Sequence, residues 1–299
     1  MKLCLGTVQF GMNYGIKKHP KPSYHDVMSM LDYATQNGIY AIDTARAYGD
    51  AEKLVGIFLE KRTIAREKLF LSSKMLPNTL DDVPEKNIES TILKNLTEQL
   101  KTLKTDYLDT YMFHTSAYAF KCNYLEALYN IKKKGLVNHI GVSVYFPDEA
   151  KACIASKYVD FIQLPSSILD QRMDREGVFS QLDSLPKIVH SRSAFVQGLI
   201  TMEEQNIPEN HQISIPVIKK FNTVCQKYHL KKIELALLYV KKFKQISHLV
   251  FGVDSLQELK EDLLYFNNND LNDSLFFEIK DEFNNLDANI YMPSLWVKK

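Results

Sequence analysis

Short apolar runs, each followed by a turn and an amphipathic segment, recur along the whole chain, and this repeated unit constrains the fold most. The runs typical of strands are Leu3–Gly6, Ala41–Asp43, Leu69–Ser72, Tyr107–Phe113, His139–Val142, Phe161–Leu164, Lys187–His190 and His248–Phe251. Several are apolar without alternation, as expected for strands covered on both faces. Strands that alternate with helices predict a parallel sheet, and eight of them predict a closed (β/α)8 barrel, an α/β fold of the TIM-barrel type.

The segments between these runs carry a helical spacing of apolar residues. It is clearest at Tyr24–Gln36, Glu52–Glu60, Ile88–Leu103, Tyr124–Lys134, Val217–Tyr228 and Ile233–Lys242. Barrels of this type commonly use about 250 residues as one domain, so we expect residues 1–299 to form a single barrel domain. The irregular stretch Thr201–His211 either covers the mouth of the barrel or forms a plain surface loop.

Charge and motif content argue against several classes of protein. The chain has 37 Lys and Arg against 36 Asp and Glu, so neither nucleic acid nor a membrane surface is expected as a partner, since both favour a basic excess. Apolar runs fall short of the roughly 18 residues of a membrane helix, and the start is unlike a signal peptide. We therefore expect a cytoplasmic protein. Four scattered cysteines, without a CxxC pair, predict reduced thiols and no metal site. The chain also contains neither a GxGxxG nor a Walker A sequence, which disfavours Rossmann and P-loop domains.

Polar residues stand at the ends of four successive strands, where a barrel of this type places its active site. Asp43 closes the second strand and Tyr48 lies five residues later, while Lys74 and His114 follow the third and fourth strands. A nearby ammonium lowers the pKa of a phenol from its usual value near 10. Tyr48 could then protonate a carbonyl oxygen while hydride reaches the carbon. Each residue alone has an ordinary explanation, as a cap, a packed ring or a solvated charge, but their joint placement favours a catalytic site.

The segment Asp43-Thr-Ala-Arg-Ala-Tyr48-Gly49-Asp-Ala-Glu52 resembles the DTAxxYGxxE signature of the aldo-keto reductases. Further similarities follow in order at Ser73-Lys74, Asp106–Asp109 with His114, Gly135–Ser143, Ile162-Gln163, Gln197–Leu199 and Gly252–Ser255. The resemblance implies an NAD(P)H-dependent oxidoreductase that reduces an aldehyde or ketone. It also implies that Tyr48 donates the proton, that Asp43 and Lys74 lower its pKa, and that His114 positions the substrate oxygen.

The resemblance further implies where the nicotinamide cofactor, NADP or NAD, would lie. Ser143 and Gln163 would hold the carboxamide. The Gly252–Ser255 turn would take the adenosine-phosphate end, because helix N-terminal amides favour an anion. The expected cofactor residues are Gly6, Thr7, Asp43, Ser143, Gln163, Arg192, Ser193, Phe195, Gln197, Gly252, Val253, Asp254, Ser255, Glu258 and Asp262.

Three places depart from the family pattern. Val144 follows Ser143 where an asparagine is common, which removes one carboxamide contact. Arg192 stands where many relatives have a tyrosine that stacks on the nicotinamide. A guanidinium can stack as well, but its charge disfavours the oxidised, cationic ring.

The third departure concerns the 2′-phosphate of NADPH, which binds best to guanidinium or ammonium groups. This chain instead has Ser255 with the carboxylates of Asp254, Glu258 and Asp262. The carboxylates favour NADH or the use of both cofactors, whereas the resemblance favours NADPH, and Lys260 could supply positive charge. The sequence leaves the preference open.

Two other functions stay open at this point. One is a cofactor-sensing regulatory or binding protein with little turnover, and the other is an NAD(P)-dependent epimerase. For a reductase, the partner is a small carbonyl compound, with a sugar-like one suited to a mouth that Tyr14, Tyr118 and Tyr145 would line. Its specificity would come from the loops Asn78–Glu85, Ser116–Cys122, Ile168–Gly177 and Thr201–His211, as in other barrels. We expect a monomer or weak oligomer.

Overall fold

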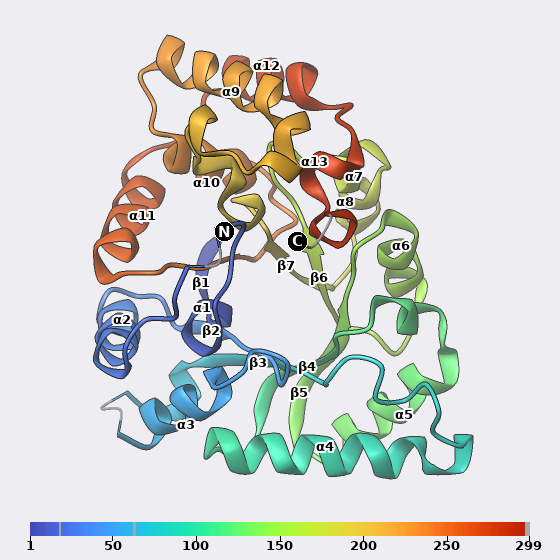
Figure 1. Cartoon of the computed structure of the whole chain (residues 1–299). Coiled ribbons are helices and arrows are strands. Elements are labelled where there is room, and N and C mark those ends of the chain that lie inside the picture. The colour runs from blue at the N-terminus through green and yellow to red at the C-terminus, as the bar shows by residue number, and fades with distance from the viewer. Residues whose placement is uncertain (18, 62–63, 297–299) are drawn as a thin grey trace.

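The computed structural model describes residues 1–17, 19–61 and 64–296. In this part of the chain, eight parallel strands pair in sequence order, and β8 returns to pair with β1. They are β1 (Lys2–Gly6), β2 (Ala41–Asp43), β3 (Phe70–Lys74), β4 (Leu108–Phe113), β5 (Val137–Ser143), β6 (Phe161–Pro165), β7 (Ile188–Arg192) and β8 (His248–Phe251). Figure 1 shows the strands at the centre with helices around them. The predicted (β/α)8 barrel is confirmed.

The helices follow the strands around the ring. The longer ones are α2 (Tyr24–Gln36), α3 (Ala51–Lys61), α4 (Ile88–Leu103), α5 (Cys122–Lys133), α6 (Pro147–Ala155), α9 (Ile215–Tyr228), α10 (Lys232–Lys241), α11 (Leu256–Asn268) and α12 (Asp273–Phe283). Short ones are α1 (Val8–Gly11), α7 (Arg172–Arg175), α8 (Val178–Leu182) and α13 (Ala288–Tyr291). Local chemistry sets their ends: Ser23 and Asp26 form a capping box at the start of α2, and Gly38 follows its end with φ near +85°, a conformation that glycine adopts at little cost.

Four strands run further toward the barrel mouth than the sequence predicts, and in all but β6, which gains Pro165, the added residues are polar. β3 continues to Lys74, β5 to Ser143 and β7 to Arg192, and each of these residues is paired with a neighbouring strand. The hydrophobic pattern stops earlier because these side chains are polar, although the backbone keeps its hydrogen bonds. The candidate site residues therefore lie on rigid strands.

Aromatic rings fill the other end of the barrel. Phe70, at the start of β3, lies against Phe161, His190 and His248, with ring centroids 6.4, 5.3 and 5.7 Å apart. This layer, together with the apolar residues of the surrounding helices, packs the barrel interior. A packed floor leaves the carboxyl ends of the strands as the place for a cavity.

Candidate active site

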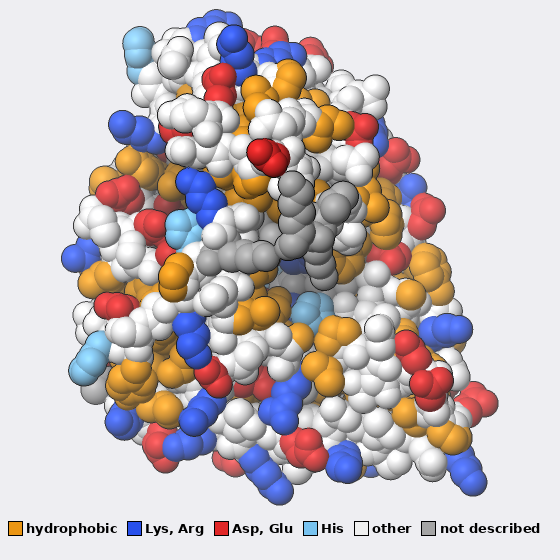
Figure 2. All heavy atoms as spheres, viewed as in Figure 1, with side chains coloured by type: hydrophobic (Ala, Val, Ile, Leu, Met, Phe, Trp, Pro, Cys, Tyr) orange, Lys and Arg blue, Asp and Glu red, His pale blue; other side chains and the backbone are white. Residues whose placement is uncertain are grey.

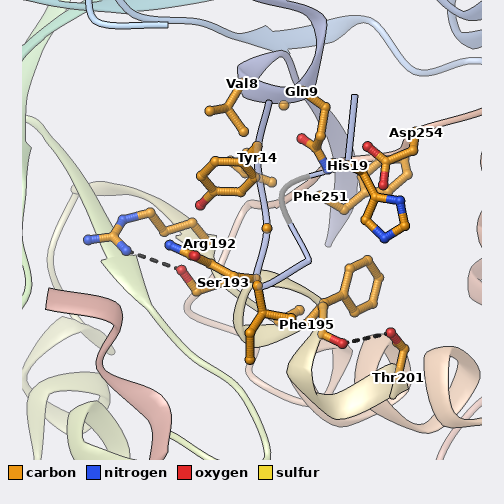
Figure 3. Close-up of a pocket in the computed structure, with 18 of the residues that line it drawn as sticks. Val8, Gln9, Tyr14, His19, Arg192, Ser193, Phe195, Thr201, Phe251 and Asp254 are labelled. Carbon is orange, nitrogen blue, oxygen red and sulfur yellow. Dashed lines mark hydrogen bonds between the residues drawn. The ribbon is translucent and has the colours of Figure 1, made fainter. Parts of the chain in front are cut away.

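A cavity of about 530 Å³ opens at the carboxyl ends of the strands, within the roughly 300–1,000 Å³ typical of small-molecule and cofactor sites. Its walls come from the ends of β1, β2, β5, β7 and β8 and from the loops that follow them. Figure 3 shows Arg192 and Ser193 on one side of this cavity, and His19 and Asp254 on the other. The cavity therefore has two chemically different ends.

A chain of buried polar groups lies beneath the end that holds Arg192. Lys74 Nζ donates to Asp43 Oδ2 at 2.5 Å and to the Thr44 carbonyl at 3.0 Å. Gln163 Nε2 donates to the other carboxylate oxygen of Asp43 at 2.7 Å, and Ser143 Oγ donates to Gln163 Oε1 at 3.1 Å. Lys74 and Gln163 are fully buried. Each buried charge has a partner, as the cost of burial requires.

Tyr48 is placed by a backbone contact between two loops. A Cβ atom on Gly11 would lie 1.7 Å from the Tyr48 carbonyl oxygen, and one on Gly49 would lie 2.3 Å from the Gly11 carbonyl oxygen. Asp50 N also donates to the Gly11 carbonyl. Only glycine permits so close an approach, so α1 holds the turn that carries Tyr48.

Tyr48 and His114 meet edge to face over Lys74. Their ring centroids are 5.7 Å apart at an interplanar angle of 85°, and Lys74 Nζ lies 5.0 Å from the centre of the Tyr48 ring. Burial, and then the positive charges of Lys74 and Arg192, lower the pKa of His114 to about 3. His114 is therefore neutral near pH 7 and can act as a hydrogen-bond donor but not as an acid.

The predicted lowering of the Tyr48 pKa is wrong in direction. Burial, and next the negative charge of Asp43, raise the pKa of Tyr48 above its usual value, and Arg192 is the cation that lowers it. The Lys74 ammonium is paired with Asp43. The phenol is therefore protonated at neutral pH.

Arg192 is held in place at the end of β7. Its guanidinium donates to the Val144 carbonyl at 2.9 Å and to Ser193 Oγ at 3.1 Å, and lies 4.3 Å from the centre of the Tyr145 ring. The sequence change at Val144 thus has a structural counterpart, because the backbone of that residue anchors the arginine. Beyond it, Ser193, Val196 and Gln197 have positive φ, a strained conformation for side-chain-bearing residues that concentrates at functional sites.

The opposite end of the cavity lies where β8 leads into α11. Asp254, Glu258 and Asp262 line it. The backbone N–H of Asp254 donates to Glu258 Oε2 at 2.8 Å, and Ser255 Oγ caps α11 by accepting from the N–H of Glu258. Burial and the carboxylates of Glu258 and Glu261 raise the pKa of Asp262 to about 8. This end is rich in carboxyl groups, only some of which are ionised at neutral pH.

Most of the residues predicted from sequence come together around this one cavity. The catalytic candidates Asp43, Tyr48 and His114 line it, as do the cofactor candidates Gly6, Thr7, Ser143, Arg192, Ser193, Phe195, Gln197, Gly252, Asp254, Glu258 and Asp262. Lys74 and Gln163 lie beneath the cavity floor, Val253 is buried in the wall, and Ser255 caps α11. Those four residues do not themselves line the cavity.

Of the segment after β1, sequence reasoning predicted only Tyr14 at the mouth and missed Ile16 and His19, which also line the cavity. The N–H of Ile16 donates to the Gln197 carbonyl at 3.0 Å, which links Ile16 to the loop after β7. Gln9, at the start of the same connection, also lines the cavity. The one sequence feature that could have indicated this turn is Gly15. Its φ is near +84°, and it turns the chain toward the mouth.

The predictions for the mouth were right in part. Tyr14 and Tyr145 line the cavity, whereas Tyr118 is buried and hydrogen-bonds Asp81 Oδ1 and the Leu80 N–H. Of the four loops proposed to set specificity, only Thr201–His211 contributes to the cavity as described, through residues such as Thr201 and Asn206. The structure therefore supports the interpretation of Thr201–His211 as a loop over the barrel mouth.

A family model described as the aldo/keto reductase family matches residues 2–282. The chain belongs to that family. As an aldo-keto reductase it is an NAD(P)H-dependent oxidoreductase, and its cofactor is a nicotinamide dinucleotide.

Individual relatives are distant. The chain is 25% identical over 256 residues to the uncharacterized oxidoreductase YqkF of Bacillus subtilis, covering 79% of this chain and 80% of that protein. It is 25% identical over 263 residues to an NADH-specific methylglyoxal reductase of Escherichia coli, with 78% and 80% covered. The solved structure of the aldo-keto reductase AKR11C1 from Bacillus halodurans, in its holo form, is 19% identical with a TM-score of 0.77 over 98% of this chain and 95% of that one. That likeness concerns the fold.

The cavity of this aldo-keto reductase fits a polar, elongated cofactor. Three buried polar atoms along it, Gln9 Oε1, His114 Nδ1 and Asp262 Oδ1, have no hydrogen-bond partner among the described residues. Such atoms are costly unless a ligand or water satisfies them. A Cβ on Gly252 would lie 2.2 Å from Gln9 Oε1, so the absence of a side chain at Gly252 lets the Gln9 amide lie against the wall of the cavity. The candidate cofactor residues are thus compatible with a nicotinamide dinucleotide.

Proposed function

We propose that this protein reduces an aldehyde or ketone to an alcohol, with Tyr48 as the proton donor. The observation that carries the proposal is the pairing of a protonated phenol with a neutral imidazole at one end of the cavity. The pKa of Tyr48 is raised and that of His114 is lowered to about 3. Of the two, only Tyr48 therefore has a proton to give near pH 7.

The surrounding residues would orient the carbonyl group and support proton transfer from Tyr48. His114 would donate a hydrogen bond to the substrate oxygen and so orient the carbonyl. As the oxygen gains negative charge it becomes a stronger base than phenolate, which makes transfer of the Tyr48 proton favourable. The resulting phenolate would lie 5.0 Å, measured to the ring centre, from the Lys74 ammonium, whose charge then stabilises it. The Asp43 carboxylate keeps that ammonium charged and fixed in position.

The bound cofactor would supply hydride to the carbonyl carbon. Arg192, Ser193 and Gln197 are the candidates that would hold it at the reacting end, with Ser143 and Gln163 below. Gly252 and the start of α11 are the candidates for the adenosine end.

The test is the variant Tyr48→Phe. We expect turnover of reactive aldehydes to fall about 100- to 10,000-fold, the usual contribution of a positioned acid, while binding of the reduced cofactor changes little. Loss of reduced-nicotinamide absorbance gives the rate, and calorimetry gives the affinity. Tyr24→Phe, an exposed tyrosine on α2, is the matched control.

Three outcomes separate the open functions. Wild-type turnover in Tyr48→Phe would refute the assignment of the proton donor. Tight cofactor binding by the wild type without turnover of any carbonyl compound would favour a cofactor-sensing protein. Turnover without net consumption of reduced cofactor would favour an epimerase.

We further propose that residues 1–299 act as one barrel domain, monomeric or weakly associated, on a small carbonyl compound in the cytoplasm. Among the described residues, the structure contains no helix with the length and apolar character to cross a membrane. Acidic and basic side chains are interspersed on the face shown in Figure 2, which suits a small-molecule enzyme better than a nucleic-acid-binding protein.

A further inference from the structure

The carboxyl-rich end of the cavity bears on which dinucleotide the protein selects. Asp254, Glu258 and Asp262 come from one turn and the first two turns of α11, and all three line the same end of the cavity. Burial, and then the charge of Glu258, raise the pKa of Asp254 and of Asp262. The carboxylates that are ionised, those of Glu258 and Asp254, therefore make a further negative charge at this end unfavourable.

Of the three, Asp262 places the clearest requirement on a ligand. Its side chain is 2% exposed, and its Oδ1 atom has no hydrogen-bond partner among the described residues although the residue lines the cavity. A buried carboxyl oxygen without a partner is best satisfied by a ligand that brings a hydrogen-bond donor. A ribose hydroxyl meets this requirement whether or not the carboxyl is protonated, because a hydroxyl both donates and accepts.

Among the described residues, Lys17 and His19 bring positive charge or potential positive charge to the lining near this end. Lys260, the lysine that could have bound a phosphate, instead places Nζ 5.4 Å from the centre of the Tyr33 ring on α2 and does not line the described cavity. His19 lies near Asp254 in Figure 3, where the carboxylate can pair with it. Lys17 lines the cavity but is itself exposed, so solvent screens its charge. Arg192 belongs to the other end (Figure 3).

We propose that this end of the cavity makes the enzyme select NADH over NADPH, because its carboxyl groups suit the free hydroxyls of an adenosine ribose and repel a 2′-phosphate. The proposal rests on the proposed function, since it requires the adenosine part of the cofactor to lie against α11. It reverses the preference that the family resemblance alone implies.

The test measures binding rather than turnover. Wild-type protein is titrated by calorimetry with NADH, with NADPH and with adenosine 2′,5′-bisphosphate, which carries the 2′-phosphate without the nicotinamide. We expect NADPH to bind at least about 10-fold more weakly than NADH, a difference of about 1.4 kcal/mol, and the bisphosphate to bind more weakly than ADP.

Variants that remove single charges test which residues cause the NADH preference. Glu258→Gln and Asp254→Asn each remove one charge from the cavity and should reduce the NADH preference, and the double variant should reduce it further. Asp32→Asn is the control, because Asp32 is an exposed carboxylate on α2 that lies outside this cavity. Lys17→Gln should leave the preference unchanged, whereas a further loss of NADPH affinity in that variant would show that Lys17 binds the phosphate.

The results discriminate between the two proposals. Equal or tighter binding of NADPH by the wild type would overturn the NADH preference and leave the reductase function intact. No binding of either dinucleotide would instead remove the proposed function itself. If the NADH preference persists in the Glu258 and Asp254 variants, other residues must cause it, and the role given to these carboxyl groups is refuted.

Discussion

Arg192 carries the charge that distinguishes the reacting end of the cavity. Its field lowers the pKa of His114 and opposes the rise in the pKa of Tyr48, so it reaches both candidate catalytic side chains. A fixed cation beside the nicotinamide stabilises the neutral, reduced form relative to the oxidised, cationic form. With the nicotinamide placed as proposed, we expect this charge to favour carbonyl reduction over alcohol oxidation.

The variant Arg192→Gln tests this effect. We expect the ratio of the dissociation constants of NAD⁺ and NADH to fall about tenfold, corresponding to about 1.4 kcal/mol, because only the oxidised cofactor gains from loss of the charge. Calorimetry on the purified protein measures both constants. Arg175→Gln, an exposed arginine on α7, serves as control. An unchanged ratio would show that the guanidinium does not act on the ring.

At the scale of elements, the contact between α1 and the turn before α3 decides where Tyr48 lies. The Gly11 position has no room for a methyl group, since the Tyr48 carbonyl occupies it. The loops would have to separate by more than an ångström to accept one. Because displacements of about 1 Å cost catalysis heavily, this contact is a condition for activity.

The variant Gly11→Ala should therefore lose at least about 10-fold in turnover, in line with the roughly 100-fold cost of a 1 Å displacement. Gly177→Ala is the control for backbone strain, because Gly177, unlike Gly11, has positive φ and has no atom within 4 Å of an added Cβ. Comparing thermal unfolding of the two variants separates backbone strain from displacement of Tyr48. Wild-type turnover in Gly11→Ala would show that the turn can shift without consequence.

The strands and helices were predictable because each follows from local pattern. The capping box at Ser23, the glycine after α2 and the apolar strands all act within a few residues along the chain. The catalytic candidates were predictable from their places at strand ends.

In contrast, the segment from Tyr14 to His19 reaches the cavity by a hydrogen bond to Gln197 across the mouth. A contact between residues so far apart leaves no periodic trace in the sequence, and the balance of charges around Tyr48 likewise depends on the folded geometry.

On the scale of the whole molecule, the aromatic floor of the barrel links stability to pH. His190 is fully buried and neither ring nitrogen has a partner in the described structure. Burial lowers its pKa well below the usual value, and burial also lowers the pKa of His248 to about 4. In the unfolded chain both would take up a proton near pH 6.5. The unfolded state therefore binds more protons below that pH, and stability falls as the pH decreases toward 4.

The variant His190→Phe tests the contribution of this layer. At about pH 5 a histidine that stays neutral in the fold costs about 2 kcal/mol relative to neutral pH, or about 4 °C in Tm. We expect the drop in Tm between about pH 7.5 and about pH 5 to be smaller in the variant by roughly this amount. Calorimetric scans measure it, with His25→Phe on the exposed face of α2 as control. An identical drop in variant and wild type would assign the acid sensitivity elsewhere.

Along the chain, the candidate proton-transfer residues are separated from the residues proposed to set the choice of cofactor. The candidate proton-transfer residues Asp43, Tyr48, Lys74 and His114 all precede β5, whereas Arg192 and the carboxyls from Asp254 to Asp262 all follow it. On the proposed assignment, the first half of the barrel would carry the proton-transfer residues, and the second half the features in which this chain departs from the family pattern. A change of cofactor preference would then need substitutions in only one half of the gene, with the candidate catalytic residues left intact.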